Sequence, residues 1–105
     1  MFPITPAPTQ YVLPRPFISM QGQVHKSGVV NTMTTLNVPN NTVEVLVQAL
    51  TQNIRYTLDG STPTASYGFR LTAGNDPIRI QMAPTTTLKF ISETAGAILE
   101  WEYGQ

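Results

Sequence analysis

Apolar and polar residues alternate along several short stretches of the chain, most clearly just before its C-terminus. There Leu99, Trp101 and Tyr103 fall on one face of an extended strand, while Glu100 and Glu102 fall on the other. A period of two residues is typical of a half-buried β-strand, because successive side chains point to opposite faces. We expect the three apolar side chains in the core or in an interface, and the two glutamates in water.

The same patterning, together with runs of β-branched residues, predicts a chain built from short strands. Turn signals such as Asp59-Gly60 separate the strands. The run at residues 42–50 also carries a partial helical periodicity, so a helix stays open as an alternative there. The predicted strands cover residues 17–21, 29–38, 42–50, 54–58, 78–82, 87–92 and 97–103.

Strand and turn signals recur about every 8–12 residues, and no segment has a convincing amphipathic helical pattern. We therefore predict an all-β fold, a single antiparallel β-sandwich with jelly-roll or immunoglobulin-like topology; a small barrel also fits. The pattern does not separate these topologies, because each gives alternating strands joined by polar turns. A length of 105 residues provides for one hydrophobic core.

Residues 1–16 hold five of the nine prolines, interleaved with apolar and aromatic side chains. Proline removes backbone donors and favours extended conformations, so this segment is predicted to be an extended Pro-rich arm ahead of a sandwich domain at 17–105. Apolar side chains spaced along an extended chain favour docking on a neighbouring chain; packing on its own domain and disorder are the alternatives. The expected anchors are Phe2, Ile4, Tyr11, Leu13 and Phe17.

Charged residues make up only 11% of the chain, against a typical value of about 25%, and six basic residues balance six acidic ones. Without net charge the chain has no long-range field to attract nucleic acid or anionic lipid, so we expect neither partner, whereas protein–protein association is favoured. No segment approaches the roughly 18 apolar residues of a membrane span. We expect a soluble chain without an export signal.

The residues offer little for catalysis or metal binding. His25 is the only histidine, and without any cysteine no second nitrogen or sulfur ligand completes a transition-metal site. Nucleophilic catalysis would need a Ser or Thr beside a base and an oxyanion site, which one histidine in a polar loop does not supply. We expect no enzyme activity and no cofactor. Structural roles are expected for the carboxylates Glu44, Asp59, Asp76, Glu93, Glu100 and Glu102.

The loop that follows Asp59 is the best candidate for a contact surface. Asp59 can cap a turn with its carboxylate, Gly60 supplies the positive φ of a tight turn, and Pro63 fixes φ in the loop beyond. Five aromatic side chains could stack on a sugar ring: Tyr56, Tyr67, Phe69, Trp101 and Tyr103. The alternation of Tyr56, Trp101 and Tyr103 favours the core for these three, and Tyr67, in a loop beside Gly68, is the freest candidate. The predicted loop contact surface consists of Asp59, Ser61, Thr62 and Tyr67.

Residues 54–64, with the sequence IRYTLDGSTPT, resemble a motif of the immunoglobulin-like C-terminal modules of chitobiase and hexosaminidase-type enzymes. In those modules a strand ends in a Thr-Asp-Gly-Ser-Thr-Pro-like turn. The resemblance implies an immunoglobulin-like fold and, as one alternative for this chain, a carbohydrate-binding module with a glycan as partner.

The chain as a whole is similar to small virion proteins of tailed bacteriophages. The likeness rests on the Pro-rich start, the Thr-rich β body, the YTLDGSTPTA turn, and the GFRLTAGND and ISETAGAIL segments. It implies a capsid decoration or cement protein on the virion surface, made in the host cytoplasm. Its partners would be the major capsid protein and neighbouring copies in a homo-oligomer, a trimer by analogy with other decoration proteins. A head–tail or tail connector component is a further alternative.

Overall fold

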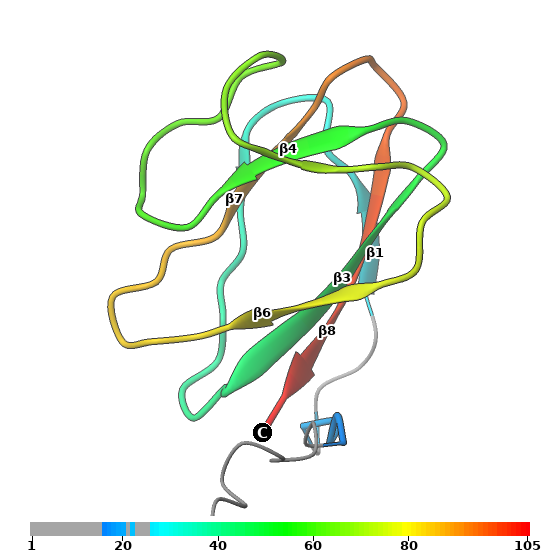
Figure 1. Cartoon of the computed structure of the whole chain (residues 1–105). Coiled ribbons are helices and arrows are strands. Elements are labelled where there is room, and N and C mark those ends of the chain that lie inside the picture. The colour runs from blue at the N-terminus through cyan, green and yellow to red at the C-terminus, as the bar shows by residue number, and fades with distance from the viewer. Residues whose placement is uncertain (1–15, 21, 23–25) are drawn as a thin grey trace, which may run out of the picture.

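The computed structural model describes residues 16–20, 22 and 26–105, which form two antiparallel sheets of four strands each (Figure 1). The first sheet has the strand order β1-β8-β3-β6, and the second has the order β2-β7-β4-β5. No helix occurs in this part of the chain. The predicted all-β sandwich is therefore confirmed. The strands are β1 (Lys26–Val29), β2 (Thr34–Thr35), β3 (Glu44–Leu50), β4 (Ile54–Thr57), β5 (Phe69–Leu71), β6 (Ile78–Gln81), β7 (Lys89–Ser92) and β8 (Ile98–Gly104).

The two longest strands, β3 and β8, lie side by side at the centre of the first sheet. Their register places Val47 opposite Trp101 and Ala49 opposite Leu99, so the inward side chains of one strand meet those of the other. Val47, Ala49 and Leu99 are buried. The alternation predicted for both strands is confirmed, and the helical alternative for β3 is wrong, because its β-branched residues pack better on a pleated surface.

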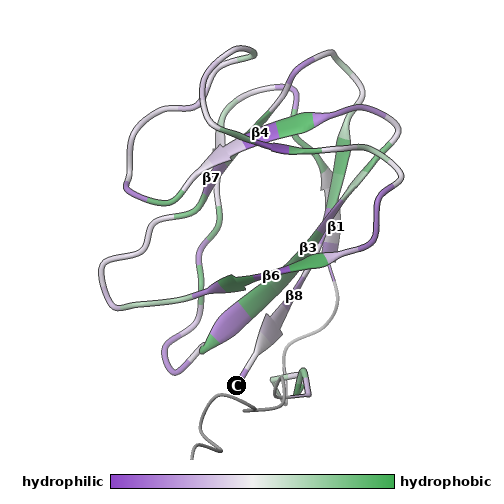
Figure 2. Cartoon of the chain, in the orientation of Figure 1, coloured by the Kyte–Doolittle hydropathy of each residue, from purple (hydrophilic) through white to green (hydrophobic). Residues whose placement is uncertain are grey.

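The core lies between the two sheets. Val45 and Leu99 contribute from the first sheet, while Ile54 and Phe90 contribute from the second, and all four are fully buried. Figure 2 shows hydrophobic segments on strands of both sheets. Burying side chains of this size removes apolar surface from water, the main favourable contribution to folding.

The first strands are where the sequence pattern was wrong. A strand was expected at residues 29–38, but the pairing begins earlier, in β1, and β2 has only two residues. β1 is an edge strand with mostly exposed side chains, held by backbone pairing to β8, so it needs no apolar alternation. Of the strand expected at 17–21, the described part forms one bridge, between Ser19 and Gly104.

The glutamates of β8 are half-buried rather than fully in water. The Ser19 hydroxyl donates a hydrogen bond to the carboxylate of Glu102. Glu44, on the same outer face at the start of β3, is only 1% exposed. Its Oε1 accepts a hydrogen bond from the Gln81 side-chain amide at 3.4 Å and lies 4.0 Å from Arg79 Nε. These contacts support a structural role for Glu44.

Candidate binding cleft

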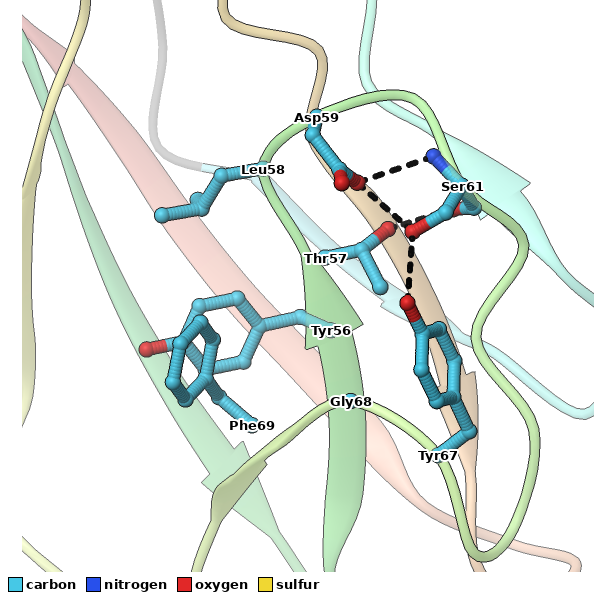
Figure 3. Close-up of a pocket in the computed structure, with 8 residues that line it drawn as sticks. All are labelled: Tyr56, Thr57, Leu58, Asp59, Ser61, Tyr67, Gly68 and Phe69. Atoms are coloured by element: carbon cyan, nitrogen blue, oxygen red, sulfur yellow. Dashed lines mark hydrogen bonds between the residues drawn. The ribbon is translucent and has the colours of Figure 1, made fainter.

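A cleft of about 430 Å³ opens at the end of β4, where the chain leaves the second sheet before returning to it as β5 (Figure 3). Because β5 is the outermost strand of that sheet, the cleft lies at the edge of the sheet. Its walls come from the end of β4, the following loop and the start of β5. The lining residues are Tyr56, Thr57, Leu58, Asp59, Ser61, Tyr67, Gly68 and Phe69.

One side of the cleft is aromatic. Tyr56 lies opposite Phe69 in the β4–β5 pair, with ring centroids 5.6 Å apart and ring planes at 42°. Tyr56 also stacks on Phe90 of the core at 5.8 Å, and burial raises the pKa of the Tyr56 phenol. Phe69, in contrast, is 64% exposed, because an edge strand leaves one side open. A partly buried ring therefore supports an exposed one.

The other side of the cleft is polar and links a carboxylate to a phenol (Figure 3). Asp59 Oδ1 accepts hydrogen bonds from the Ser61 hydroxyl at 2.6 Å and from the Ser61 backbone N–H at 3.0 Å. The Ser61 hydroxyl in turn lies 3.4 Å from the Tyr67 hydroxyl. The hydrogen bonds from Ser61 hold the pKa of Asp59 below its ordinary value, so its carboxylate stays charged near neutral pH. The Tyr67 ring is 53% exposed.

The loop that carries these polar groups is fastened to the neighbouring strands. The Thr57 hydroxyl donates to the Ser61 carbonyl at 2.6 Å, and Lys89 Nζ donates to the Gly60 carbonyl at 2.8 Å. Gly60 has a φ of 87°, a left-handed conformation that glycine adopts without strain. Covered by this loop, Thr57 is only 5% exposed although it lies on the outward face of β4.

The return of the chain to the sheet depends on Gly68. Its φ is 121°, and a Cβ placed on it would lie 2.8 Å from the Tyr56 carbonyl oxygen. Arg55 Nη1 donates to the Gly68 carbonyl at 2.9 Å. Just before it, Thr64 and Tyr67 exchange two backbone hydrogen bonds of 3.0 and 3.2 Å. The cleft is thus formed by a loop whose two ends are both fixed.

The structure brings together three of the four residues predicted from the sequence as a loop contact surface. Asp59, Ser61 and Tyr67 all line the cleft, whereas Thr62 is exposed outside the lining. The predicted surface does not include Phe69, although this ring is among those that could stack on a sugar and it lines the cleft. The available signal was its place directly after Gly68 in a short strand segment, but nothing in the pattern showed that this strand would be an edge.

Of the five predicted arm anchors, the structure describes Phe17. A Cβ placed on Gly104 would lie 2.6 Å from the Phe17 ring, so this ring packs closely on the end of β8. The Arg79 guanidinium carbon lies 6.0 Å from the ring centroid. Phe17 thus contacts its own chain, and a contact with a neighbouring chain stays a prediction. The remaining anchors lie outside the described residues: Phe2, Ile4, Tyr11 and Leu13.

Among the described residues, no group of three or more His, Cys, Asp or Glu side chains is placed to hold a metal ion. His25 lies outside these residues. No helix in the described part of the chain is long and apolar enough to cross a membrane.

A second hollow, of about 690 Å³, lies between the turn at residues 38–42 and the connection at 82–86. Among the residues that the structure describes, those that line it include no aromatic side chain. The Thr42 hydroxyl donates to the Pro39 carbonyl at 2.7 Å, so this polar group serves the turn itself. The cleft at residues 56–69 is the better candidate site, because it combines exposed rings with oriented polar groups.

Comparison with known proteins identifies one family. Residues 25–99 match the family model of the chitobiase/beta-hexosaminidase C-terminal domain, a match that includes the whole cleft and more than half of the chain. The resemblance first seen in the short motif at residues 54–64 therefore extends over most of the fold. No match was found among curated proteins or among solved structures.

Proposed function

Because the chain belongs to the chitobiase/beta-hexosaminidase C-terminal domain family, we propose that it is a non-catalytic, immunoglobulin-like module that binds carbohydrate in the cleft at residues 56–69. The family match supports the immunoglobulin-like fold. The carbohydrate ligand is inferred from the chemistry of the cleft, and the absence of catalysis from the sequence, whose single histidine does not complete a catalytic group.

The observation that carries this proposal is the pair of exposed rings flanking Gly68. Tyr67 and Phe69 are 53% and 64% exposed and line the same cleft. Apolar surface gathered at a cleft and bordered by polar groups is typical of a binding site. Aromatic rings pack well against the C–H faces of sugars, because both surfaces are apolar and flat. Asp59, linked to Tyr67 through the Ser61 hydroxyl, offers a charged acceptor for sugar hydroxyl groups.

The fastening of the loop supports the same conclusion. A loop that must order itself on binding loses affinity through conformational entropy, whereas a loop already held in place loses little. Here Thr57, Lys89 and Arg55 each donate a hydrogen bond to a carbonyl of the loop segment. The cleft is therefore built to meet a ligand with little rearrangement.

Replacing Tyr67 by alanine should remove most carbohydrate binding while leaving the fold intact. Loss of a stacked ring is expected to weaken binding by about 10- to 100-fold, as for aromatic hot-spot residues. The measurement is a glycan-array screen of the native chain and of Tyr67→Ala, followed by calorimetry on the strongest glycan. Val29→Ala, at an exposed apolar residue on the first sheet, serves as the matched control. A native chain that binds no glycan would contradict the proposal.

We also propose that the module is displayed on a virus particle as a capsid decoration or cement protein; a connector component is the alternative. One edge of the first sheet supports an assembly role. The segment at residues 18–20 and strand β1 both pair with the same side of β8, and they carry Ile18 and Val29 at 52% and 59% exposure. A low charge content also limits repulsion between crowded copies.

As a cement protein, the chain would stabilise the shell by binding assembled lattice more tightly than dissociated capsid subunits. Many copies would then add their modest contacts through avidity. We expect the copy number in purified particles to reach the order of hundreds, as repeated display on a lattice requires. Quantitative mass spectrometry against the major capsid protein measures it. A number on the order of a dozen would favour a connector ring, and absence would rule out a virion role.

A further inference from the structure

Two arginines face each other on the outer side of the second sheet, next to the cleft. Arg55 of β4 lies directly opposite Arg70 of β5 in the strand register. Like charges in this arrangement repel and weaken strand pairing. One carboxylate joins them: Glu93 Oε2 accepts hydrogen bonds from Arg55 Nε at 2.5 Å and from Arg70 Nε at 2.7 Å.

Glu93 is itself held in place by the backbone. Its N–H donates to the Asn53 carbonyl at 2.9 Å, directly before β4. The side chain of Asn53 accepts a hydrogen bond from the Ala73 N–H at 2.8 Å, just after β5. The carboxylate is therefore presented at a fixed position between the two strands, although Arg70 is about half exposed (49%) to solvent.

The cluster reaches the cleft through Arg55. With its Nε bound to Glu93, Arg55 donates from Nη1 to the carbonyl of Gly68, the residue between the two exposed rings. The planar guanidinium presents its donors in a rigid fork, so the bond to the carboxylate fixes the direction of the bond to the loop. A lysine could not make both bonds in this way.

We propose that Glu93 and Arg55 are positioning residues for the cleft: Glu93 neutralises the opposed arginines and orients Arg55, which holds the Gly68 carbonyl and so sets Tyr67 and Phe69. The inference rests on the proposed function of the cleft. The positioning role itself is nevertheless a property of the unliganded chain, so it can be tested without any ligand.

Acid should weaken the contact between Glu93 and Arg55, and with it the hold of Arg55 on the loop. The hydrogen bonds from Arg70 and Arg55 lower the pKa of Glu93, and these two arginines are the charged groups found to face it from β5 and β4. A lowered pKa in the folded state contributes stability that is present above the unfolded value of about 4.3 and is lost as the pH falls through the folded value. The contact of Glu93 with Arg55, and so the hydrogen bond from Arg55 to the Gly68 carbonyl, should therefore be intact at neutral pH and weaken only in acid.

The test is amide hydrogen exchange by NMR on the unliganded chain at neutral pH, comparing the native chain with Glu93→Gln. Exchange at the Thr64 and Tyr67 amides, which bond within the loop, should speed up by at least about tenfold, the effect of losing a charge-assisted hydrogen bond. Amides in β3 and β8 should keep their native rates. Unchanged loop exchange in Glu93→Gln would overturn the proposal.

A double variant tests whether Glu93 acts through its charge. If Glu93 acts by neutralising the opposed arginines, Arg70→Gln added to Glu93→Gln should restore much of the loop protection; no restoration would overturn the neutralising part of the proposed role. Asp76→Asn, at an exposed carboxylate in the β5–β6 connection, is the control and should leave loop exchange unchanged.

In acid, loop exchange in the native chain should approach that of Glu93→Gln measured at the same pH. If the variants show the expected exchange rates but the native chain binds no glycan, the proposed function of the cleft is refuted and the positioning role stands.

Discussion

Gly68→Ala should lower the free energy of unfolding by about 2–4 kcal/mol and distort the cleft, because alanine at this position is both strained and crowded. The residue has a φ of 121°, which side-chain-bearing residues rarely adopt. Its added Cβ would also lie 2.8 Å from the Tyr56 carbonyl oxygen, a backbone atom that cannot swing aside. Urea unfolding at neutral pH measures the change, and the two neighbouring rings should lose their native positions.

Gly74→Ala is the matched control for this effect. Gly74 also has a positive φ, of 84°, but a Cβ placed on it meets no heavy atom within 4 Å. Gly74→Ala should therefore lower the free energy of unfolding only by the cost of placing alanine at a positive φ, about 1 kcal/mol. Equal losses in the two variants would mean that the close approach at Gly68 contributes nothing.

Phe90→Ala should lower the free energy of unfolding by about 3–5 kcal/mol, the usual range for deleting a fully buried aromatic ring. Phe90 is 0% exposed in β7, and its ring stacks on Tyr56 with centroids 5.8 Å apart. Removing it opens a cavity in the core and withdraws the support beneath the aromatic side of the cleft. Thermal and urea unfolding both report this loss.

Phe69→Ala provides the comparison within the same group of rings. Phe69 contacts Tyr56 from the other side but is 64% exposed, so little apolar surface returns to water when it is removed. Its replacement should cost under about 1 kcal/mol of stability while weakening carbohydrate binding. If Phe69→Ala destabilised the chain as much as Phe90→Ala, the outer ring would have to be part of the core instead of the binding surface.

Alternation predicted the centre of the fold because the residues there face two different environments. In β3 and β8 one face meets the core and the other is mostly half-buried. The sequence pattern and the burial therefore agree, as in Val47 and Leu99. β1 was not predicted, because its side chains are mostly exposed and show no alternation between core and solvent. Its pairing to β8 uses backbone groups, which leave no trace in the side-chain pattern.

The cleft could be predicted in part, through its turn chemistry. Asp59 and Gly60 gave a turn by their intrinsic preferences, and this placed Ser61 and Tyr67 in one exposed loop. The contribution of Phe69 depends on the order of strands in the sheet, and the link from Glu93 to the loop joins segments far apart in the sequence. Such long-range contacts follow from topology, which local patterns do not contain.

The most direct test of the central claim, that the cleft at residues 56–69 binds carbohydrate, is an NMR titration of the isotope-labelled chain with neutral hexose and N-acetylhexosamine oligosaccharides. Binding in the cleft predicts amide shift changes confined to β4 from Tyr56 onward, the loop and the start of β5, with much smaller changes in Tyr67→Ala at the same sugar concentration. Shift changes gathered on the edge that carries Ile18 and Val29, or no change with any sugar at millimolar concentration, would contradict it.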